Sequence, residues 1–287
     1  MIQQKLMSPC KRHGGKSYLA SKIIGLMPPR VMNANKPAPG DSGWVHYVEP
    51  FFGGGAVLFA QDPMGISEVV NDIDLELTTF WDVLKSPAGF SELRQLLSVT
   101  PCSQVEFERA RQVDENASAV VRAAAFFVRN RQSRQALGNA FATLARTRTR
   151  RGMNELPSAW LSAIDGLPEV HARLQRVVIL NKSAIDVIRQ QDDTRTFFYL
   201  DPPYVHGTRT VPSAYSHEMT DEDHRELLAT IAGIRGRFIL SGYDNPLYTD
   251  FADQHGWRRV DIEIDNKAGS GREKRTMTEC LWMNYCG

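Results

Sequence analysis

The residues with the clearest chemical potential are Asp201-Pro202-Pro203-Tyr204, which directly follow the apolar run Thr196 to Leu200. The run predicts a buried strand that the prolines end, so the four residues are expected at the strand's carboxyl end. A carboxylate, a proline carbonyl and an aromatic ring held there can accept the hydrogens of a planar amine and stack on its ring. This suggests methyl transfer to a nucleobase amine, although the tetrapeptide alone also suits an ordinary strand-ending turn.

A glycine-rich segment, Glu49 to Gly55, lies between a predicted strand and a predicted helix. Glycines there let the backbone approach a ligand closely, although a tight strand-helix turn would also need them. The dinucleotide fingerprint is incomplete because Leu58 replaces its third glycine, and the Lys-Ser/Thr ending of a phosphate-binding loop is absent. Asp72, at the end of the next predicted strand, is placed to accept hydrogen bonds from ribose hydroxyls. Because the segment lacks the features that bind phosphates, it suits a cofactor that has a ribose but no pyrophosphate. S-adenosylmethionine is such a cofactor.

Two further charges flank predicted helices. Lys16 ends a Gly-Gly-Lys turn before a helix, where the helix dipole disfavours a cation, so it either holds a ligand carboxylate or is an exposed charge. Asp74 is an alternative ribose ligand, but its place at a helix start favours a solvated position.

Basic residues cluster locally although the formal net charge is only +1, which excludes a global basic field. Arginines can contact phosphates and read guanine edges, whereas any single one can equally belong to a solvated face. As a cluster they favour DNA contact. The first group is Arg129, Arg131, Arg134, Arg146, Arg148, Arg150 and Arg151, and the second is Lys267, Arg272, Lys274 and Arg275.

The elements that must position these residues alternate between strand and helix, which predicts an α/β fold with a largely parallel sheet. The long segment 87–174 shows helical periodicity and no convincing strand. We therefore expect a catalytic domain formed by residues 1–86 and 175–287, with 87–174 as an inserted helical subdomain. Predicted strands are 45–48, 68–71, 177–180, 196–200 and 238–241, with an antiparallel pair at 257–264 and 278–285.

The composition bears on the class of protein, on metal binding and on the expected location in the cell. Of the 287 residues 42% are hydrophobic and 23% charged, as in a globular protein. The four cysteines lack metal-ligand spacing, so no metal is expected. The sequence has neither an apolar stretch of membrane-spanning length nor a leader, which predicts a cytoplasmic protein without membrane contact.

Four motifs in order resemble the Dam-type, or D12 class, family of DNA adenine-N6 methyltransferases. They are Lys11 to Lys16, Tyr47 to Gly55, Asn71 to Asp74 and Asp201 to Tyr204. One departure is Arg12-His13 before Gly14, where the family often has an aromatic residue. The resemblance implies a Rossmann-like class I S-adenosylmethionine-dependent methyltransferase sheet, with 87–174 as the target-recognition insertion. It implies cofactor contacts from Arg12, Lys16, Glu49, Pro50, Phe51, Gly53, Gly55, Asp72, Ile73 and Asp201, and catalysis by Asp201, Pro202, Pro203 and Tyr204.

The reaction implied is methyl transfer from S-adenosylmethionine to an adenine flipped out of double-stranded DNA, because a paired adenine amine is buried in the duplex. Asp201 and the Pro202 carbonyl would orient the amine for in-line displacement. Two alternatives stay open: an RNA base-amine (guanine N2) methyltransferase, and a non-catalytic DNA-binding module. A restriction-modification role and a monomeric or weakly dimeric state are both compatible with the sequence.

Overall fold

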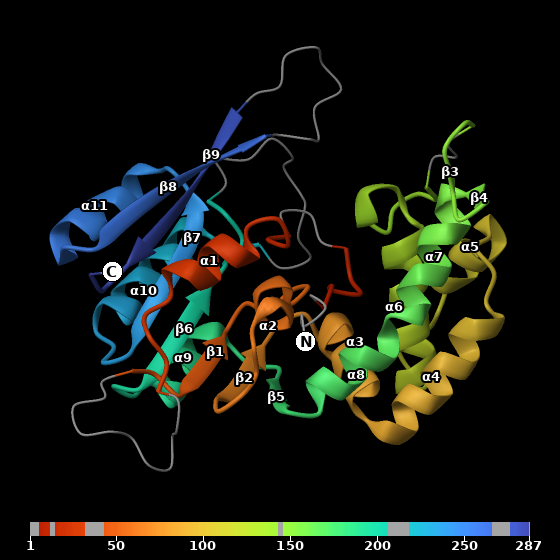
Figure 1. The fold of residues 1–287 in the computed structure, drawn as a ribbon, viewed down its shortest axis with the longest axis horizontal. Helices are drawn as coiled ribbons and strands as arrows, with labels where there is room; N and C mark the ends of the chain where they lie inside the picture. The colour runs from red at the N-terminus through yellow and green to blue at the C-terminus, as the bar shows by residue number, and fades with distance from the viewer. Residues whose placement is uncertain are drawn as a thin grey trace. The chain divides into compact units, whose positions relative to one another are not determined.

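The computed structural model describes residues 6–11, 15–31, 43–142, 146–205, 218–265 and 276–286. Its central sheet has seven strands in the order β5-β2-β1-β6-β7-β9-β8 (Figure 1). The four strands β2, β1, β6 and β7 pair in parallel in this order. Strand β9 is antiparallel to both of its neighbours, β7 and β8. The strands are β1 (His46–Glu49), β2 (Ser67–Asn71), β5 (Val177–Leu180), β6 (Thr196–Leu200), β7 (Arg237–Tyr243), β8 (Arg258–Asp265) and β9 (Thr276–Met283).

The strand order identifies the fold class. Numbered along the chain, the sheet reads 3-2-1-4-5-7-6, which is the doubly wound order 3-2-1-4-5-6 with one antiparallel strand, β9, inserted before the edge. The predicted Rossmann-like α/β class is confirmed. The order reverses between β1 and β6, and in such sheets ligands bind beyond the carboxyl ends of the strands at this point.

The positions of most strands follow from their apolar runs. Strands β5 and β6 have the predicted limits, β1, β2 and β7 differ by one to two residues, and the antiparallel pairing of β8 with β9 is confirmed. All five residues of β6 are buried, as expected for a central parallel strand covered on both faces.

The chain divides into two compact units. The helical unit comprises Met1–Gly25, Gly53–Asp62 and Asp74–Asn181, and the sheet unit comprises Leu26–Phe52, Pro63–Ile73 and Lys182–Gly287. The predicted insertion at 87–174 lies within the helical unit, which also includes Gly53 to Gly55 of the glycine loop and the helix after β2. The predicted domain limits stay a prediction.

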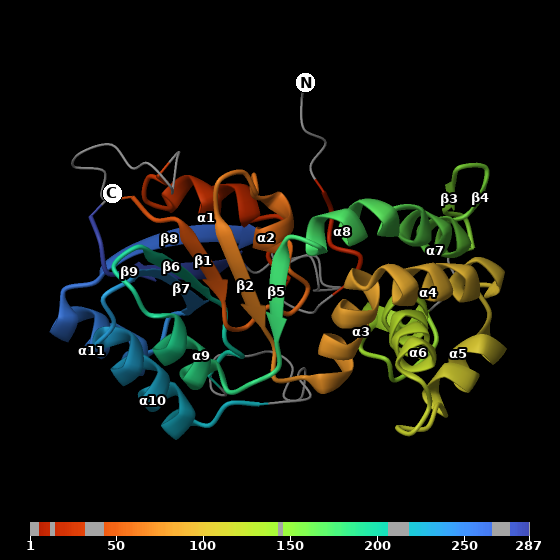
Figure 2. The same cartoon turned by 90° about the horizontal axis from the view of Figure 1, so that it is seen from below.

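In the sheet unit, three helices lie on one face of the sheet (Figure 2). They are α9 (Ala184–Gln191), α10 (Asp221–Ala232) and α11 (Pro246–His255). Helix α10 begins with a capping box, in which Thr220 and Asp223 exchange hydrogen bonds. Helix α11 was not predicted, although Asn245 caps it, Pro246 opens it and Gly256 follows it, which are ordinary helix boundary signals.

The remaining helices are α1 (Ala20–Leu26), α2 (Ala56–Ala60), α3 (Leu75–Lys85), α4 (Pro87–Val99), α5 (Gln104–Arg111), α6 (Ala119–Gln132), the 3₁₀ turn η1 (Arg134–Ala136), α7 (Glu155–Asp165) and α8 (Leu167–Leu174). Helix α6 has eight buried residues and is central among α3, α4, α5 and α7, which it contacts.

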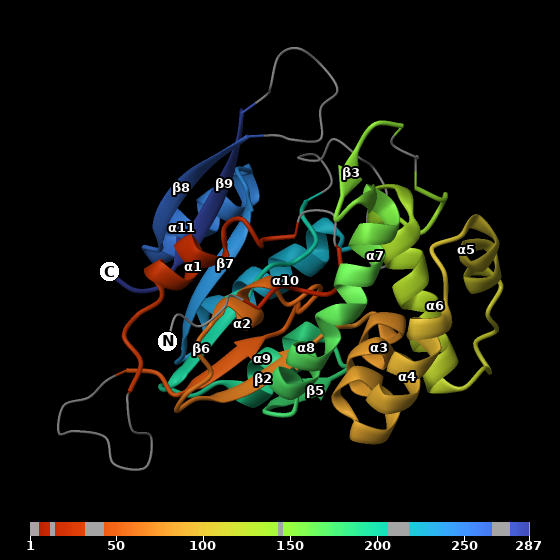
Figure 3. The same ribbon diagram turned by 45° about the vertical axis from the view of Figure 1, so that its right-hand side comes forward.

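The prediction that 87–174 contains no strand was wrong. A short hairpin, β3 (Thr149–Arg150) with β4 (Met153–Asn154), packs on α7 (Figure 3). Its turn residues Arg151 and Gly152 both have positive φ, 55° and 73°, as a tight hairpin turn requires. Strands of two residues are too short to show a periodic pattern. Arginine is also an unusual residue at the first position of such a turn, so the sequence did not indicate the hairpin.

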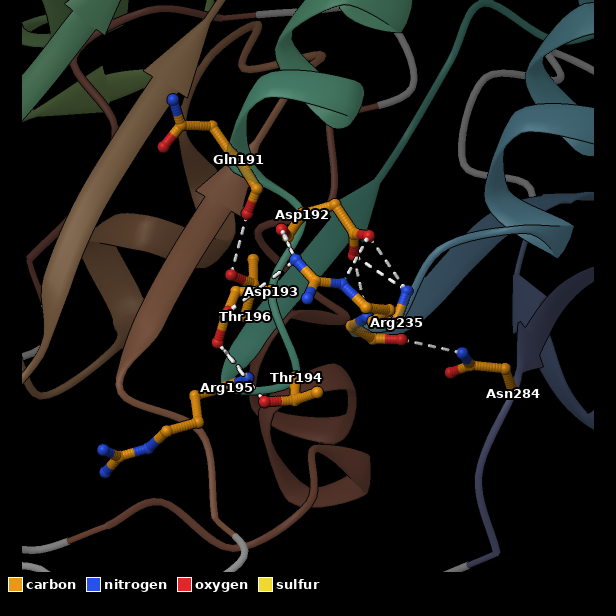
Figure 4. Close-up of polar contacts among 9 residues, drawn as sticks. Gln191, Asp192, Asp193, Thr194, Arg195, Thr196, Arg235 and Asn284 are labelled. Atoms are coloured by element: carbon orange, nitrogen blue, oxygen red, sulfur yellow. Dashed lines mark hydrogen bonds and ion pairs between the residues drawn. The ribbon is translucent and has the colours of Figure 1, made fainter.

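A carboxylate clamp holds the amino ends of β6 and β7 together (Figure 4). Asp192 Oδ1 accepts hydrogen bonds of 2.9 Å from the backbone N–H groups of Arg235 and Gly236, and the Arg235 guanidinium donates to the Asp192 carbonyl at 2.9 Å. A Cβ at Gly236 would lie 3.0 Å from both Phe198 and the Thr196 carbonyl, so only glycine permits this approach. The clamp therefore sets the position of β6, the strand directly before Asp201.

We expect D192A to lower the free energy of unfolding by about 1–3 kcal/mol, because two backbone N–H groups, one of them on the buried Gly236, lose a charged acceptor. Urea unfolding followed by circular dichroism measures this. The matched control is E226A, which removes an exposed carboxylate paired with Arg189 at 3.3 Å and should cost under about 1 kcal/mol. Equal losses in the two variants would contradict the clamp.

Candidate active site

The tetrapeptide lies at the switch point of the sheet. Asp201 directly follows β6, and the parallel register pairs Val48 of β1 with Phe198 of β6. The carboxyl ends of β1 and β6 therefore lie at the same edge of the sheet. Asp201 and Pro203 are partly exposed, whereas Pro202 and Tyr204 are buried. The predicted position at the carboxyl end of a buried strand is confirmed.

The Asp201 carboxylate is oriented by the neighbouring strand. Ser241 of β7 donates to Asp201 Oδ1 at 2.9 Å, and the Ser241 hydroxyl lies 3.4 Å from the Tyr199 hydroxyl. Ser241 is fully buried. Burial, followed by the Asp201 charge, raises the pKa of Tyr199 well above its usual range. A carboxylate has about four acceptor sites, so Asp201 has the capacity to accept an amine hydrogen beside the Ser241 bond.

Tyr204 is held by a second carboxylate. Its hydroxyl donates to Glu279 of β9 at 2.5 Å and lies 3.4 Å from Asp201 Oδ1. Its ring meets Tyr243 edge-on, with centroids 4.6 Å apart. Burial, then the charges of Asp201 and Glu279, raises the pKa of Tyr204 well above its usual range, so the phenol keeps its proton. Sequence reasoning missed Ser241, Tyr243 and Glu279, because only strand pairing brings them to the tetrapeptide.

The end of β1 carries a similar pair. The Tyr47 hydroxyl donates to Glu49, and both side chains are buried. Burial and the Glu49 carboxylate raise the pKa of Tyr47 well above its usual range. Pro50 is buried and Phe51 is partly exposed. Of the predicted cofactor residues at the end of β1 and directly after it, Phe51 is more accessible than Glu49 and Pro50.

Asn71, the last residue of β2, connects three segments beyond the strand ends. Its amide donates at 3.0 Å to the carbonyls of both Pro50 and Lys182 and accepts at 2.9 Å from the Lys182 N–H. Its own carbonyl accepts from the Phe52 N–H at 2.8 Å. Asn71 is 1% exposed. A single side chain therefore fixes the backbone that enters the glycine loop.

The two residues after Asn71 are accessible to solvent. Asp72 is partly exposed, and Ile73 is 50% exposed although it is apolar. An acidic group for ribose hydroxyls beside an apolar surface for a base suits a nucleoside. Asp74 instead caps α3, accepting from the N–H groups of Glu76 and Leu77 at 3.1 Å. The sequence-based placement of Asp74 at a helix start is confirmed.

In the helical unit, the glycine loop leads into α2. Gly53 and Gly55 have φ of 49° and 68°, a conformation that other residues rarely adopt, and Gly55 is the N-cap of α2. The Trp81 indole donates to the Gly53 carbonyl at 3.2 Å and so attaches the loop to α3. The two positive φ angles give the loop a conformation without projecting side chains at these positions, and a ligand can approach such a backbone closely.

Lys16 is 3% exposed, so the alternative that it is an exposed charge was wrong. The Lys16 carbonyl accepts from the N–H groups of Leu19 and Ala20 at 2.8 Å, immediately before α1. Arg12, predicted as a cofactor contact, lies outside the described residues.

The first arginine cluster separates into two kinds. Arg129 forms an ion pair with Glu76 and donates to the Ala110 carbonyl at 2.5 Å. Arg131 donates to the carbonyls of Pro9 and Ala159, and burial lowers its pKa. Arg129 and Arg131 therefore connect helix α6 to other helices of the helical unit. Their described contacts serve the packing of this unit.

The other arginines of the cluster, Arg134, Arg146, Arg148, Arg150 and Arg151, are exposed. Two make surface ion pairs, Arg148 with Glu155 at 3.6 Å and Arg151 with Asp165 at 3.4 Å. Four of the five lie on or beside the β3–β4 hairpin. The second predicted group, Lys267, Arg272, Lys274 and Arg275, lies outside the described residues.

A comparison with known protein families identifies the family of this chain. A family model described as D12 class N6 adenine-specific DNA methyltransferase matches residues 13–261. The chain belongs to this family. It is therefore an adenine-specific DNA methyltransferase, and the Asp-Pro-Pro-Tyr segment of this methyltransferase lies inside the matched range. A search of curated proteins found no significant match.

One similar solved structure is a candidate RNA methyltransferase from Pyrococcus horikoshii, at 9% identity and a TM-score of 0.36. The alignment covers 93% of this chain and 96% of that protein. A likeness this weak carries no argument about substrate. Among the residues that the methyltransferase structure describes, no cluster of His, Cys, Asp or Glu could hold a metal ion. Within the same residues, no helix has the length and apolarity to span a bilayer.

We expect N71A to lower the free energy of unfolding by about 1–3 kcal/mol, since the backbone groups of Pro50 and Lys182 lose the buried Asn71 side chain as their hydrogen-bond partner. Because the same bonds order the cofactor segment, affinity for S-adenosylmethionine should fall about tenfold, equivalent to about 1.4 kcal/mol. Chemical unfolding and isothermal titration calorimetry measure these effects. N116A, at an exposed turn, is the control, and unchanged affinity in N71A would contradict the role of Asn71.

Proposed function

We propose that this enzyme transfers the methyl group of S-adenosylmethionine to the N6 amine of an adenine extruded from double-stranded DNA. The observation that carries the proposal is the oriented Asp201 carboxylate, held by Ser241 at 2.9 Å beside Tyr204 at the carboxyl end of β6. An acceptor and an aromatic ring at this position suit a base that carries an amine.

The cofactor would bind beyond the ends of β1 and β2. Asp72 would accept from the ribose hydroxyls, Ile73 would cover the adenine ring, and Glu49 and Pro50 would support this part of the sheet unit from within. For the amino acid part of the cofactor, the glycine loop and Lys16 are proposed as contacts on sequence grounds alone. When bound, S-adenosylmethionine supplies an electrophilic methyl group on a sulfonium.

The target base must leave the duplex, at a cost of a few kcal/mol, because its amine is otherwise buried among stacked pairs. Stacking on Tyr204 would offset about 1–3 kcal/mol of that cost. Asp201 and the Pro202 carbonyl would each accept one amine hydrogen and so direct the nitrogen lone pair toward the methyl group. Pro203 would limit backbone movement at this point. The residues act by position and electrostatics, without a covalent enzyme intermediate.

Exposed arginines of the hairpin region are proposed to contact the DNA backbone. Arg146, Arg148, Arg150 and Arg151 present four cations within six residues on one small hairpin. Ion pairs with single exposed carboxylates are weak, so phosphates can replace them. The group Lys267, Arg272, Lys274 and Arg275 is proposed as a second backbone contact on sequence grounds alone. Cytoplasmic location, restriction-modification and oligomeric state stay predictions.

The test of the function is methylation of DNA and of ribosomal RNA by the purified enzyme, followed by identification of the modified base. We expect N6-methyladenine in DNA and no label in RNA. Label in RNA alone would support the guanine-amine alternative and contradict the proposal.

We expect D201A to reduce methylation at least about a hundredfold while leaving DNA affinity within about threefold. The reason is that the adenine amine loses the Asp201 carboxylate as its hydrogen-bond acceptor in the reacting complex. D201N keeps one acceptor oxygen and should retain more activity than D201A. The control is D253A, an exposed carboxylate on α11, which should behave as wild type. Rates come from single-turnover methyl transfer, and full activity of D201A would contradict the assignment. If D201N is as inactive as D201A, Asp201 must also accept the proton.

We expect R148A/R150A to weaken DNA binding similarly for all sequences and to reduce the slope of log affinity against log salt by about 1 per arginine. Fluorescence anisotropy over a salt series measures the slope. R109A/R111A is the matched control, because it also removes two exposed arginines, here paired with Glu106 and Glu108 on α5. An unchanged slope in R148A/R150A would contradict DNA contact by the hairpin.

A further inference from the structure

The inserted antiparallel strand β9 contributes a buried carboxylate to the site. Glu279 is 1% exposed, and its Oε1 accepts from the Tyr204 hydroxyl at 2.5 Å. A charged or polar group at this depth is costly unless it is hydrogen-bonded. The bond joins Glu279 to the aromatic residue of the tetrapeptide.

Strand pairing places Glu279 beside a second residue that contacts Tyr204. Tyr243 of β7 is the direct antiparallel partner of Glu279 on β9, and directly opposed residues project to the same face of a sheet. Tyr243 meets the Tyr204 ring edge-on at 4.6 Å between centroids. The opposed pair therefore contacts both the ring and the hydroxyl of Tyr204, and we refer to Tyr243 and Glu279 together as the Tyr204 support.

The same face of β7 also orients Asp201. Ser241 lies two residues before Tyr243, so the two side chains project on the same side of the strand. Ser241 donates to Asp201 Oδ1, while Tyr243 packs on Tyr204. One strand face thus positions the first and last residues of the tetrapeptide.

The direction of the Tyr204 hydrogen bond follows from the distances. A phenol has one proton, and its oxygen lies 2.5 Å from Glu279 but 3.4 Å from Asp201. The proton therefore points to Glu279 and leaves Asp201 Oδ1 to Ser241. Loss of Glu279 would release the hydroxyl to turn toward Asp201, where it would compete with an incoming amine.

We propose that Glu279 is a positioning residue of this methyltransferase, which holds the Tyr204 ring ready to stack on the extruded adenine and keeps the Tyr204 hydroxyl away from Asp201. The inference rests on the proposed function for its effect on catalysis. The hydrogen bond that it invokes is measurable without any reaction.

The test compares E279Q, E279L, Y204F and the double variant Y204F/E279L. We expect E279L to lower kcat/KM for DNA about tenfold and E279Q to stay within about threefold of wild type, because an amide can still accept the phenol proton. In the Y204F background E279L should cost under about twofold, because the bond is already absent. Y285F is the control: it removes a phenol bond of 2.9 Å to the Leu26 carbonyl, elsewhere in the sheet unit, and should leave activity unchanged.

A structural role alone would predict a different pattern. If E279L lowered kcat/KM equally in the Tyr204 and Y204F backgrounds, or if E279Q were as impaired as E279L, the positioning role would be refuted. The double variant replaces both partners by apolar groups, which is often nearly neutral for stability, so it keeps the test valid if Y204F alone folds poorly.

A second readout separates this inference from the proposed function. With 3-fluorotyrosine incorporated, the ¹⁹F line assigned to Tyr204 should be sharp in wild type and E279Q and broadened or shifted in E279L. This pattern in a protein that fails to methylate DNA would refute the proposed function and leave the support intact. An identical Tyr204 line in wild type and E279L would overturn the inference, whatever the activity.

Discussion

The hydrogen bond from Ser241 to Asp201 connects the sheet to the chemistry. Asp201 stands where β6 leaves the sheet, and a carboxylate at a strand end can adopt several rotamers unless a neighbour restrains it. Ser241, fully buried on the adjacent strand, provides that restraint at 2.9 Å. The parallel pairing of β6 with β7 and the Asp192 clamp at their amino ends then determine where the carboxylate points. Catalysis by position depends on this kind of preorganisation.

Buried tyrosine-carboxylate pairs recur around the switch point. Tyr47 donates to Glu49 on β1, and Tyr204 donates to Glu279 across from β9. Each pair gives a hydrogen-bond partner to two groups that are costly to bury alone. Burial first, and the neighbouring carboxylates second, raise the pKa of both phenols well above the usual range, so the phenols keep their protons at neutral pH.

Much of the architecture could be predicted because its signals are local. The apolar run 196–200 with two following prolines predicts β6 and the place of Asp201, and Thr220 with Asp223 predicts the start of α10. The β3–β4 hairpin was missed because two residues are too short for a periodic pattern. Ser241 and Glu279 were missed for another reason: they are 40 and 78 positions from Asp201. The parallel pairing of β6 with β7 brings Ser241 to the site, and the antiparallel insertion of β9 beside β7 brings Glu279. The clustered arginines looked equivalent in sequence, but Arg129 and Arg131 turn out to have interior partners in the helical unit.

The central claim is that Asp201 and the Pro202 carbonyl receive an adenine amine whose ring stacks on Tyr204. The most direct measurement is a crystal structure of the enzyme with S-adenosylhomocysteine and a DNA duplex containing the target site. We expect the extruded adenine N6 within about 2.7–3.2 Å of both acceptors, its ring on Tyr204, and the sulfur of the product facing the nitrogen. A target base bound with its amine away from Asp201, or a product bound away from the ends of β1 and β2, would contradict the account.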